Sequence, residues 1–421
     1  MAERRPAAPR AVAGNGLLHR RTLLRSGLVF ATASAALGDG GATEPRSEAM
    51  RGPGAPFTPY GQPSKHERLV MRRISGNRVL PGNGVALTPL DELEGFITPN
   101  GLHFERHHNG VPDIDPVKHT LLIHGRVKQA LSFTVADLLR YPMRSHLMFL
   151  ECGGNSNAGW HPEPIQRPAG SFHGLISCSE WTGVPLAVLL AEAGVEPRAT
   201  WAVAEGADAF AMNVSVPVDK LVAEGIVAMY QNGERLRPEN GYPLRLIVPG
   251  WEGVLQVKWL HKLELSETPV MSRNETAKYT ELLPSGKARQ FTFVMDAKSL
   301  ITSPSHGQRL KGAGLYQVSG LAWSGRGKVK RVDVSADGGK TWAQSALQDP
   351  VLPRCLTRFR APWRWDGQAA VLQSRVVDET GYTQPTRAAL VAERGLNGYF
   401  HYNAIVSWAV EADGSVKHVY A

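Results

Sequence analysis

The chain has 421 residues, which is long for a single hydrophobic core, so we expect two or more domains. With 43% hydrophobic and 20% charged residues, the composition is that of an ordinary soluble globular protein. The formal charge is +9, but the first 46 residues hold seven Arg against three acidic residues, and no Lys-rich or Arg-rich run follows. The charge pattern therefore gives no indication of a nucleic-acid partner.

Residues 1–43 have the features of a targeting segment. The twin arginine Arg20 and Arg21 precedes a short apolar stretch at 26–38, and small residues at 31–36 and 40–42 suit cleavage. The pair predicts export of the folded protein to the periplasm by the twin-arginine route, the alternative being a disordered tail with chance arginines. No later stretch reaches the roughly 18 apolar residues of a membrane span, so we expect none.

The next segments suggest an arm and a mixed domain. Residues 44–95 are rich in Pro, Gly and Arg with weak periodicity, which predicts an extended arm packing on the domain that follows. Over 96–285, short apolar segments alternate with helical patterns: a strand at 121–125, a helix over 134–140 that Pro142 stops, and a helix over 186–193 with Gly194 as its C-cap. This alternation predicts an α+β domain.

The pattern changes after about residue 290. Strand alternation appears at 316–323 and 329–334, and Asp337-Gly338-Gly339 predicts a hairpin turn before 341–342. Short strands at regular spacing predict an all-β sandwich over 290–421.

Cys152 stands in the most informative segment of the chain. The apolar run 147–150 reads as a buried strand, and it ends in Cys152-Gly153-Gly154-Asn155. Such a thiol is either presented to a metal or a substrate, or it is a buried small residue. Cys178 and Cys355 are interpreted as buried small residues, and nothing in the sequence says that they meet.

Residues 152–155 resemble the Cys-Ala-Gly-Asn segment of the sulfite oxidase family, in which the thiolate binds molybdenum together with the dithiolene sulfurs of a molybdopterin. Four further segments follow the family's order: 104–112, 181–186, 241–250 and 257–260. Within the family the chain is similar to the molybdenum subunit of sulfane dehydrogenase from the thiosulfate-oxidising Sox system, on segments 62–65, 97–108 and 230–238. The resemblance implies an α+β molybdopterin-binding domain of the sulfite oxidase fold, followed by an immunoglobulin-like dimerisation domain.

The resemblance also implies the site. Cys152 is the expected metal ligand, because thiolates select soft or thiophilic metals. The residues expected to contact the molybdopterin are Phe104, Arg106, His107, His108, Cys152, Asp208, Arg245, Gln256, Val257 and Lys258. The expected catalytic residues are Arg106, Cys152, Tyr279 and Arg394, with the two arginines binding an oxyanion and the tyrosine hydroxyl relaying a proton.

Departures from the family pattern bear on the substrate. Asn157, Leu255-Gln256 and Asn240 stand where many sulfite oxidases have charged or imidazole side chains. Fewer charges weaken the case for free sulfite, a small dianion, and fit sulfur delivered on a carrier protein.

The resemblance therefore implies a periplasmic sulfane dehydrogenase subunit that oxidises carrier-bound sulfane sulfur by oxygen-atom transfer. No Cys-x-x-Cys-His haem motif occurs, so we expect electrons to pass to a separate c-type cytochrome subunit. The expected assembly is a homodimer through the C-terminal domain or a heterotetramer with the cytochrome. The alternatives are a sulfite dehydrogenase with a cytochrome c acceptor, a reductase of methionine sulfoxide in proteins, and a cofactor-free binding protein.

Overall fold

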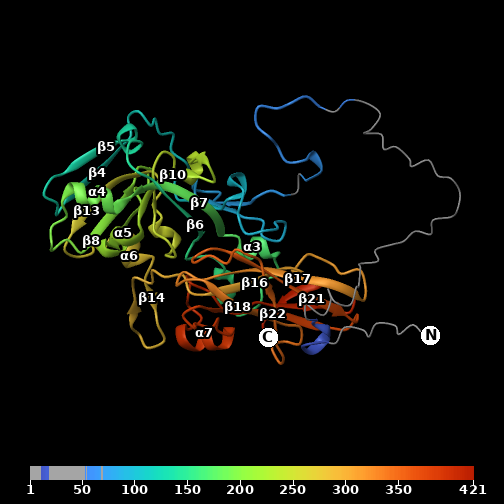
Figure 1. Cartoon of the computed structure of the whole chain (residues 1–421). Helices are drawn as coiled ribbons and strands as arrows, with labels where there is room; N and C mark the ends of the chain where they lie inside the picture. Colours follow the sequence, from blue (N-terminus) through green and yellow to red (C-terminus); the bar gives the residue numbers. More distant parts are fainter. Residues whose placement is uncertain (1–10, 19–52, 54, 68–69) are drawn as a thin grey trace, which may run out of the picture.

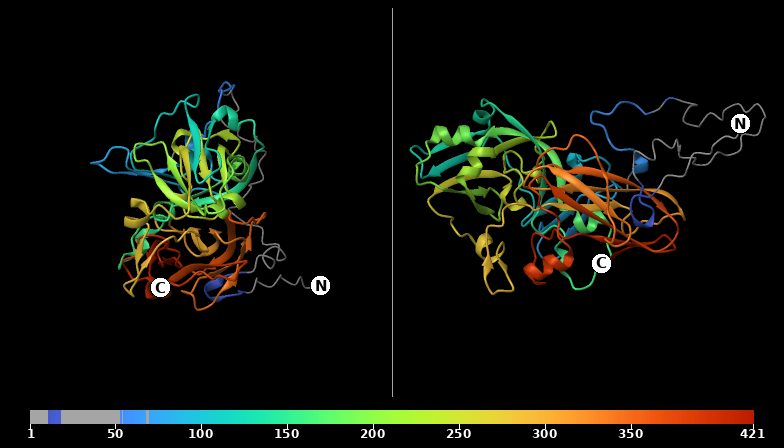
Figure 2. Two further views of the ribbon diagram at one scale, coloured as in Figure 1. Left: turned by 90° about the vertical axis from the view of Figure 1, so that its left-hand side faces the viewer. Right: turned by 60° about the horizontal axis from the view of Figure 1, so that its bottom comes forward.

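The computed structural model describes residues 11–18, 53, 55–67 and 70–421. Figures 1 and 2 show an α+β lobe and a β-sandwich lobe in close contact. The predicted twin-arginine segment lies mostly outside the described residues, with 11–18 as the exception. In the described part of the chain, no helix is long and apolar enough to cross a membrane.

Two five-stranded sheets enclose the core of the α+β lobe. The first has the order β11-β10-β7-β6, with β12 also paired to β10, and the second has the order β5-β4-β13-β8-β9. The β4–β13 pair is parallel. The strands are β4 (Thr120–Gly125), β5 (Leu131–Thr134), β6 (Arg144–Glu151), β7 (Ile176–Pro185), β8 (Trp201–Gly206), β9 (Asn213–Pro217), β10 (Ile226–Gln231), β11 (Glu234–Arg235), β12 (Arg245–Ile247) and β13 (Leu260–Ser266).

Short helices cover and connect these sheets. They are α2 (Val135–Leu138), α3 (Ala169–His173), α4 (Leu186–Ala193), α5 (Val218–Glu224) and α6 (Arg273–Ala277), with single 3-10 turns at η5 (Asn157–Trp160), η6 (Pro238–Asn240) and η7 (Gly253–Leu255). Helix α4 ends as the sequence predicts, because Gly194 takes the left-handed conformation (φ 69°) that glycine tolerates. Helix α2 is only one turn long, although Thr134 and Asp137 form the capping box that starts it.

A three-stranded sheet joins the predicted arm to the α+β lobe. Strands β1 (Arg73–Gly76) and β2 (Gly84–Leu87) come from the arm, and β2 pairs with β3 (Glu105–His107) of the following segment. The arm is therefore attached by strand pairing, next to the residues of β3 that line the cavity described below.

The C-terminal lobe is an all-β sandwich, as predicted. Its four-stranded sheet has the order β16-β17-β21-β20, and its five-stranded sheet has the order β19-β18-β22-β23-β24. The predicted turn at 337–339 connects β18 to β19, although the second strand starts at Ala343. The strands are β16 (Lys298–Ser303), β17 (Gly314–Trp323), β18 (Val329–Ser335), β19 (Ala343–Gln344), β20 (Ala346–Leu347), β21 (Thr357–Trp365), β22 (Ala370–Asp378), β23 (Ser407–Val410) and β24 (Val416–Val419).

Two further elements lie at the lower edge of Figure 1. They are the hairpin β14 (Glu281–Leu282) with β15 (Ala288–Arg289), between the lobes in sequence, and helix α7 (Arg387–Arg394) of the sandwich.

Strand β6 serves the cores of both lobes. Met148 and Leu150 face a core within the α+β lobe, whereas Phe149 packs into the core of the sandwich. This division follows from the two-residue repeat of a strand, which turns successive side chains to opposite faces.

The interface between the lobes also brings Cys178 and Cys355 together. Cys178 lies opposite Phe149 on β7, and Cys355 lies just before β21. Both are buried, as interpreted from the sequence, and their sulfurs are 3.3 Å apart. Their proximity is a finding that the sequence did not indicate.

Candidate active site

Cys152 is presented at the end of a buried strand. It follows β6 directly, and its backbone N–H donates to the carbonyl of Leu175 (3.0 Å). Its own carbonyl accepts from the amide of Asn155 (2.8 Å), which closes a tight turn over the two glycines. A side chain on Gly153 would overlap the buried carboxylate of Glu252 and would have to displace it. The strand end and the turn together fix the direction of the thiol.

A buried polar cluster supports this turn from the sandwich side. Glu151, the last residue of β6, accepts from the indole N–H of Trp323 (2.7 Å) and from the side-chain amide of Asn155 (2.9 Å). The Lys298 ammonium lies 3.6 Å from the Glu151 carboxylate, and the two side chains are only 1% and 2% exposed. Because Trp323 and Lys298 belong to the sandwich, the C-terminal lobe helps to position the residue that precedes Cys152.

The thiol opens into a cavity beside β3. The cavity holds about 730 Å³ of empty space, counting the part open to solvent. All ten residues predicted to contact the cofactor line it, together with Tyr279: Phe104, Arg106, His107, His108, Cys152, Asp208, Arg245, Gln256, Val257 and Lys258. The fold thus gathers these residues from segments that are far apart in the sequence.

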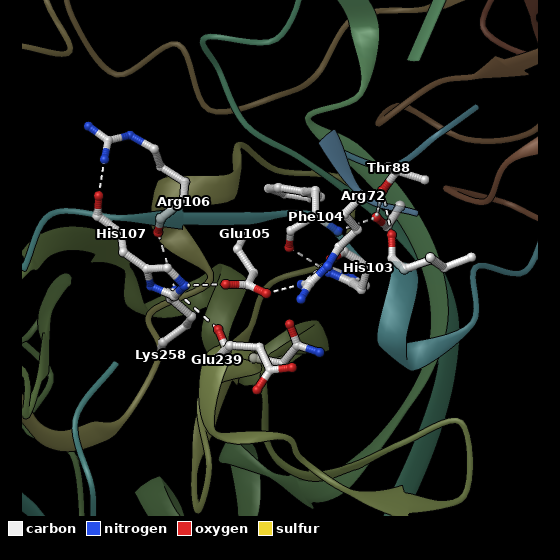
Figure 3. Close-up of polar contacts among 12 residues, drawn as sticks. Arg72, Thr88, His103, Phe104, Glu105, Arg106, His107, Glu239 and Lys258 are labelled. Atoms are coloured by element: carbon white, nitrogen blue, oxygen red, sulfur yellow. Dashed lines mark hydrogen bonds and ion pairs between the residues drawn. The ribbon is translucent and has the colours of Figure 1, made fainter. Parts of the chain in front are cut away.

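A chain of polar contacts orients His107 in the cavity wall (Figure 3). The Lys258 ammonium donates to Nδ1 of His107 (2.7 Å) and to the carbonyl of Arg106 (3.2 Å). Nε2 of His107 donates to Glu105 (2.8 Å), which also pairs with Arg72. Burial, and then the charge of Lys258, lowers the pKa of His107 to about 3, so the ring is neutral at pH 7 with its proton on Nε2.

Three cations in the cavity are held by neutral acceptors. Arg106, Arg245 and Lys258 donate to carbonyls and imidazole nitrogens among the described residues, and not to carboxylates. Burial lowers the pKa of Arg245 to about 9, and burial with the charge of Arg245 lowers that of Lys258 well below its usual range. A buried charge is costly without a counter-ion, so this set favours an anionic ligand.

His108 and Asp208 complete the polar wall. His108 stacks on Phe210 with ring centroids 4.2 Å apart, and burial, then the charge of Arg106, lowers its pKa to about 4. Asp208 accepts from the amide of Met212 at 3.4 Å. Both side chains line the cavity, and each has a neighbour that restricts its position.

The Cys152 thiol is protonated in the protein alone. Burial raises its pKa to about 11, and the hydrogen bond from the Gly154 amide opposes this rise. The thiolate is the form that binds metals, so metal binding here releases a proton.

Tyr279 lies at the boundary between this cavity and a second one. Its ring stacks on Phe400 with centroids 4.6 Å apart. Burial raises the pKa of its hydroxyl well above the usual value, and a negative charge on Cys152 would add to the rise. The hydroxyl is therefore protonated at neutral pH and able to donate a hydrogen bond.

Arg394 is placed differently from the other predicted residues. It ends helix α7, pairs with Glu281, and donates to the carbonyls of His401 (2.8 Å) and Phe400 (3.1 Å). It is not among the residues that line the cavity of Cys152. Its catalytic role stays a prediction.

No sequence pattern indicates Glu252, His401 or the role of Gly241 at this site. Glu252 is buried behind Gly153, with its carboxylate 3.4 Å from Nε2 of His401, and the His401 amide donates to the Gly153 carbonyl (2.7 Å). Gly241 has φ 109°, and a Cβ there would lie 3.1 Å from Lys258. Gly241 belongs to the segment 241–250 that resembles the sulfite oxidase family, but only the fold shows that it leaves room for the Lys258 side chain.

Comparison with known proteins agrees with this geometry. Residues 108–274 match the family described as an oxidoreductase molybdopterin binding domain, and residues 289–407 match the Mo-co oxidoreductase dimerisation domain. The chain is similar to the solved structure of the sulfane dehydrogenase SoxCD from Paracoccus pantotrophus, with a TM-score of 0.83 and 44% identity over 94% of this chain and 98% of that one. The chain belongs to the sulfite oxidase family of molybdopterin enzymes. Its cofactor is accordingly molybdenum–molybdopterin.

More distant relatives are larger proteins. Mitochondrial sulfite oxidase of Rattus norvegicus is 33% identical over 311 residues, which are 69% of this chain and 55% of the relative. The NADH nitrate reductase of Solanum lycopersicum is 30% identical over 355 residues, which are 71% of this chain and 37% of the relative. This chain thus spans about half or less of these two relatives.

The cavity fits the family's cofactor. Cys152 would bind the molybdenum, and Arg245, Lys258 and the His107–His108 pair would hold the anionic and hydrogen-bonding parts of the pterin. When bound, the molybdenum cofactor supplies two-electron oxygen-atom transfer.

Lys258→Met is expected to weaken retention of the cofactor. A hydrogen bond to a charged group contributes about 1.5–3 kcal/mol, so dissociation should rise roughly 10- to 100-fold. Molybdenum and pterin content after extended dialysis measures this effect, with Lys287→Met, at an exposed position, as the matched control. Equal retention in both variants would remove Lys258 from the cofactor site.

Proposed function

We propose that this chain is the molybdenum subunit of a periplasmic sulfane dehydrogenase. It would oxidise sulfane sulfur bound to a carrier protein and pass the electrons to a c-type cytochrome subunit. The observation that carries the proposal is the match to the sulfane dehydrogenase SoxCD over 94% of this chain. The export part rests on the twin-arginine pattern around Arg20 and Arg21.

The surroundings of the cavity support a carrier-borne substrate over free sulfite. The second cavity shares Tyr279 and Val254 with the first, and its wall combines aromatic rings with three carboxylates: Phe291, Phe293, Phe400, Glu252, Glu275 and Glu281. Glu281 also pairs with Arg394, which leaves that cation neutralised. A free dianion would be repelled by the carboxylates of this wall and would bind it weakly. Sulfur carried on a peptide arm has less negative charge, and the arm can bury apolar surface against the aromatic rings.

The residues of the chain have distinct tasks in this reaction. Arg106 lies in the cavity, where its guanidinium can hold an oxyanion of the product by charge-assisted hydrogen bonds. Tyr279, protonated at neutral pH, can donate to an oxygen beside Cys152 and pass on a proton. Water supplies each oxygen atom, with release of two protons and two electrons.

A substrate comparison tests this proposal. With the cytochrome acceptor present, carrier-bound sulfane sulfur should be oxidised with a kcat/KM at least tenfold above that for sulfite. Oxygen from labelled water should enter the product over repeated turnover. A preference for sulfite would instead establish the sulfite dehydrogenase alternative, and label from dioxygen alone would exclude oxygen-atom transfer from water.

The dimerisation-domain match at 289–407 supports assembly through the sandwich. We expect the full-length chain to be at least dimeric at micromolar concentration, either as a homodimer or within a heterotetramer with the cytochrome. Light scattering, with and without the cytochrome, measures the assembly. A monomer under both conditions would contradict it.

A further inference from the structure

Residues 11–18 pack on the C-terminal sandwich, far along the chain from their own position. In Figures 1 and 2 this dark blue segment lies against the orange and red strands in every view. Leu17 is fully buried and is part of the sandwich core, and Leu18 is 4% exposed. A segment that precedes the predicted twin arginine is therefore built into the folded domain.

The segment adds to an open strand edge. The amide of Val12 donates to the carbonyl of Leu17 (2.8 Å), which closes a small hairpin. The amide of Leu18 then donates to the carbonyl of Pro362 (2.9 Å), and Leu17 forms a β-bridge with Trp363 of β21. Strand β20 pairs with β21 only near its start, so the hairpin covers backbone groups that would otherwise lie on an exposed edge.

Side-chain contacts fix the turn of the hairpin. The indole N–H of Trp363 donates to the Asn15 carbonyl (2.6 Å), and the Asn15 amide group donates to the carbonyl of Ala336 (2.8 Å). The amide of Gly14 donates to the hydroxyl of Thr341 (2.7 Å). These partners come from β21 and from the loop after β18, so both sheets of the sandwich contribute.

Two glycines make this close approach possible. Gly16 has φ 83°, and a Cβ there would lie 2.0 Å from the carbonyl oxygen of Arg364. A Cβ on Gly14 would lie 2.2 Å from the carboxylate of Asp337. The segment Gly14-Asn15-Gly16-Leu17-Leu18 therefore fits the sandwich surface in three ways: its glycines allow the close approach, its polar groups are hydrogen-bonded there, and its leucines are buried against the core.

We propose that the sandwich contains a binding site for the chain's own residues 11–18, so that the N-terminal segment is anchored only when the C-terminal domain has folded. The hydrogen-bonding partners in the sandwich, Ala336, Thr341, Pro362 and Trp363, are all synthesised long after residues 11–18. Leu18, the last described residue of this segment, stands two positions before Arg20 in the sequence. The segment that leads into the predicted export signal is therefore held in place only in a chain whose C-terminal domain has folded.

Hydrogen exchange on the full-length chain tests the docking. The amides of Val12, Gly14 and Leu18 should exchange at least tenfold more slowly than those of an unstructured peptide. Leu17→Asp should abolish this protection, whereas Val12→Asp, at a position that is 47% exposed on the same hairpin, should preserve it. Unprotected amides in the unmodified chain, or equal protection in the two variants, would overturn the proposal.

Two controls separate docking from folding and from export. Protection of β17 and β22 reports whether the sandwich of the Leu17→Asp variant is folded; if it is not, Gly16→Val, which changes only the turn, replaces that variant. Arg20→Lys with Arg21→Lys blocks a twin-arginine export signal and should leave the protection of 11–18 unchanged. If the export proposal fails, the docking result still stands. If docking fails, the export proposal is unaffected.

Discussion

Cys152→Ser should yield a folded protein that retains no molybdenum and has no measurable turnover. The serine hydroxyl has nearly the shape of the thiol, but it does not provide the soft thiolate that the metal needs. The turn around Gly153 and the bond from the Asn155 amide involve backbone atoms, so they should survive the change. Metal analysis, turnover with the cytochrome, and thermal unfolding measure the three parts of this expectation.

Cys178→Ser is the matched control. Cys178 is buried between the lobes, with its sulfur 3.3 Å from that of Cys355, and it does not line the cavity. Its replacement should lower stability modestly and leave the metal content unchanged. Full activity of Cys152→Ser, or metal loss in Cys178→Ser alone, would contradict the assignment of Cys152 as the ligand.

Lys298→Met should destabilise the protein by about 3–5 kcal/mol, because it leaves the Glu151 carboxylate buried without its cation. Both groups are almost fully buried, and Lys298 also donates to Ser156. Urea unfolding measures the loss. Lys330→Met, at an exposed position in the same sandwich, should change stability by less than about 0.5 kcal/mol.

A double variant identifies the cause. Adding Glu151→Gln to Lys298→Met removes the unpaired charge while keeping an acceptor for the Trp323 indole, so part of the stability should return. If the double variant is no more stable than the single one, the loss comes from packing of the lysine stem and not from the uncompensated carboxylate.

The sequence predicted those parts of the molecule that depend on local patterns. The end of β6, the C-cap at Gly194, and the turn at 337–339 follow from apolar runs and glycine positions, and the structure confirms them. Eight of the ten cavity residues stand in short segments that resemble the sulfite oxidase family, whereas Asp208 and Gln256 lie outside those segments and were assigned from the wider resemblance. Their convergence on one cavity follows from the pairing of distant strands.

Other features have no local signature. Lys298 and Glu151 are 147 positions apart, and nothing near either residue indicates a buried pair. The neutralisation of Arg394 by Glu281 likewise depends on how the β14–β15 hairpin packs against α7. Such contacts are set by tertiary packing, so residue types and spacing alone do not predict them.

Because strand β6 contributes to the cores of both lobes, it affects how the protein unfolds. Because Phe149 belongs to one core and its neighbours Met148 and Leu150 belong to another, neither lobe can lose its packing without uncovering a face of the same strand. The two lobes should therefore unfold as one cooperative unit. Neither lobe should fold alone, so recombination should not transfer one lobe to another protein without the other. The cysteine at the end of that strand then acquires its final geometry only in the intact two-lobed protein.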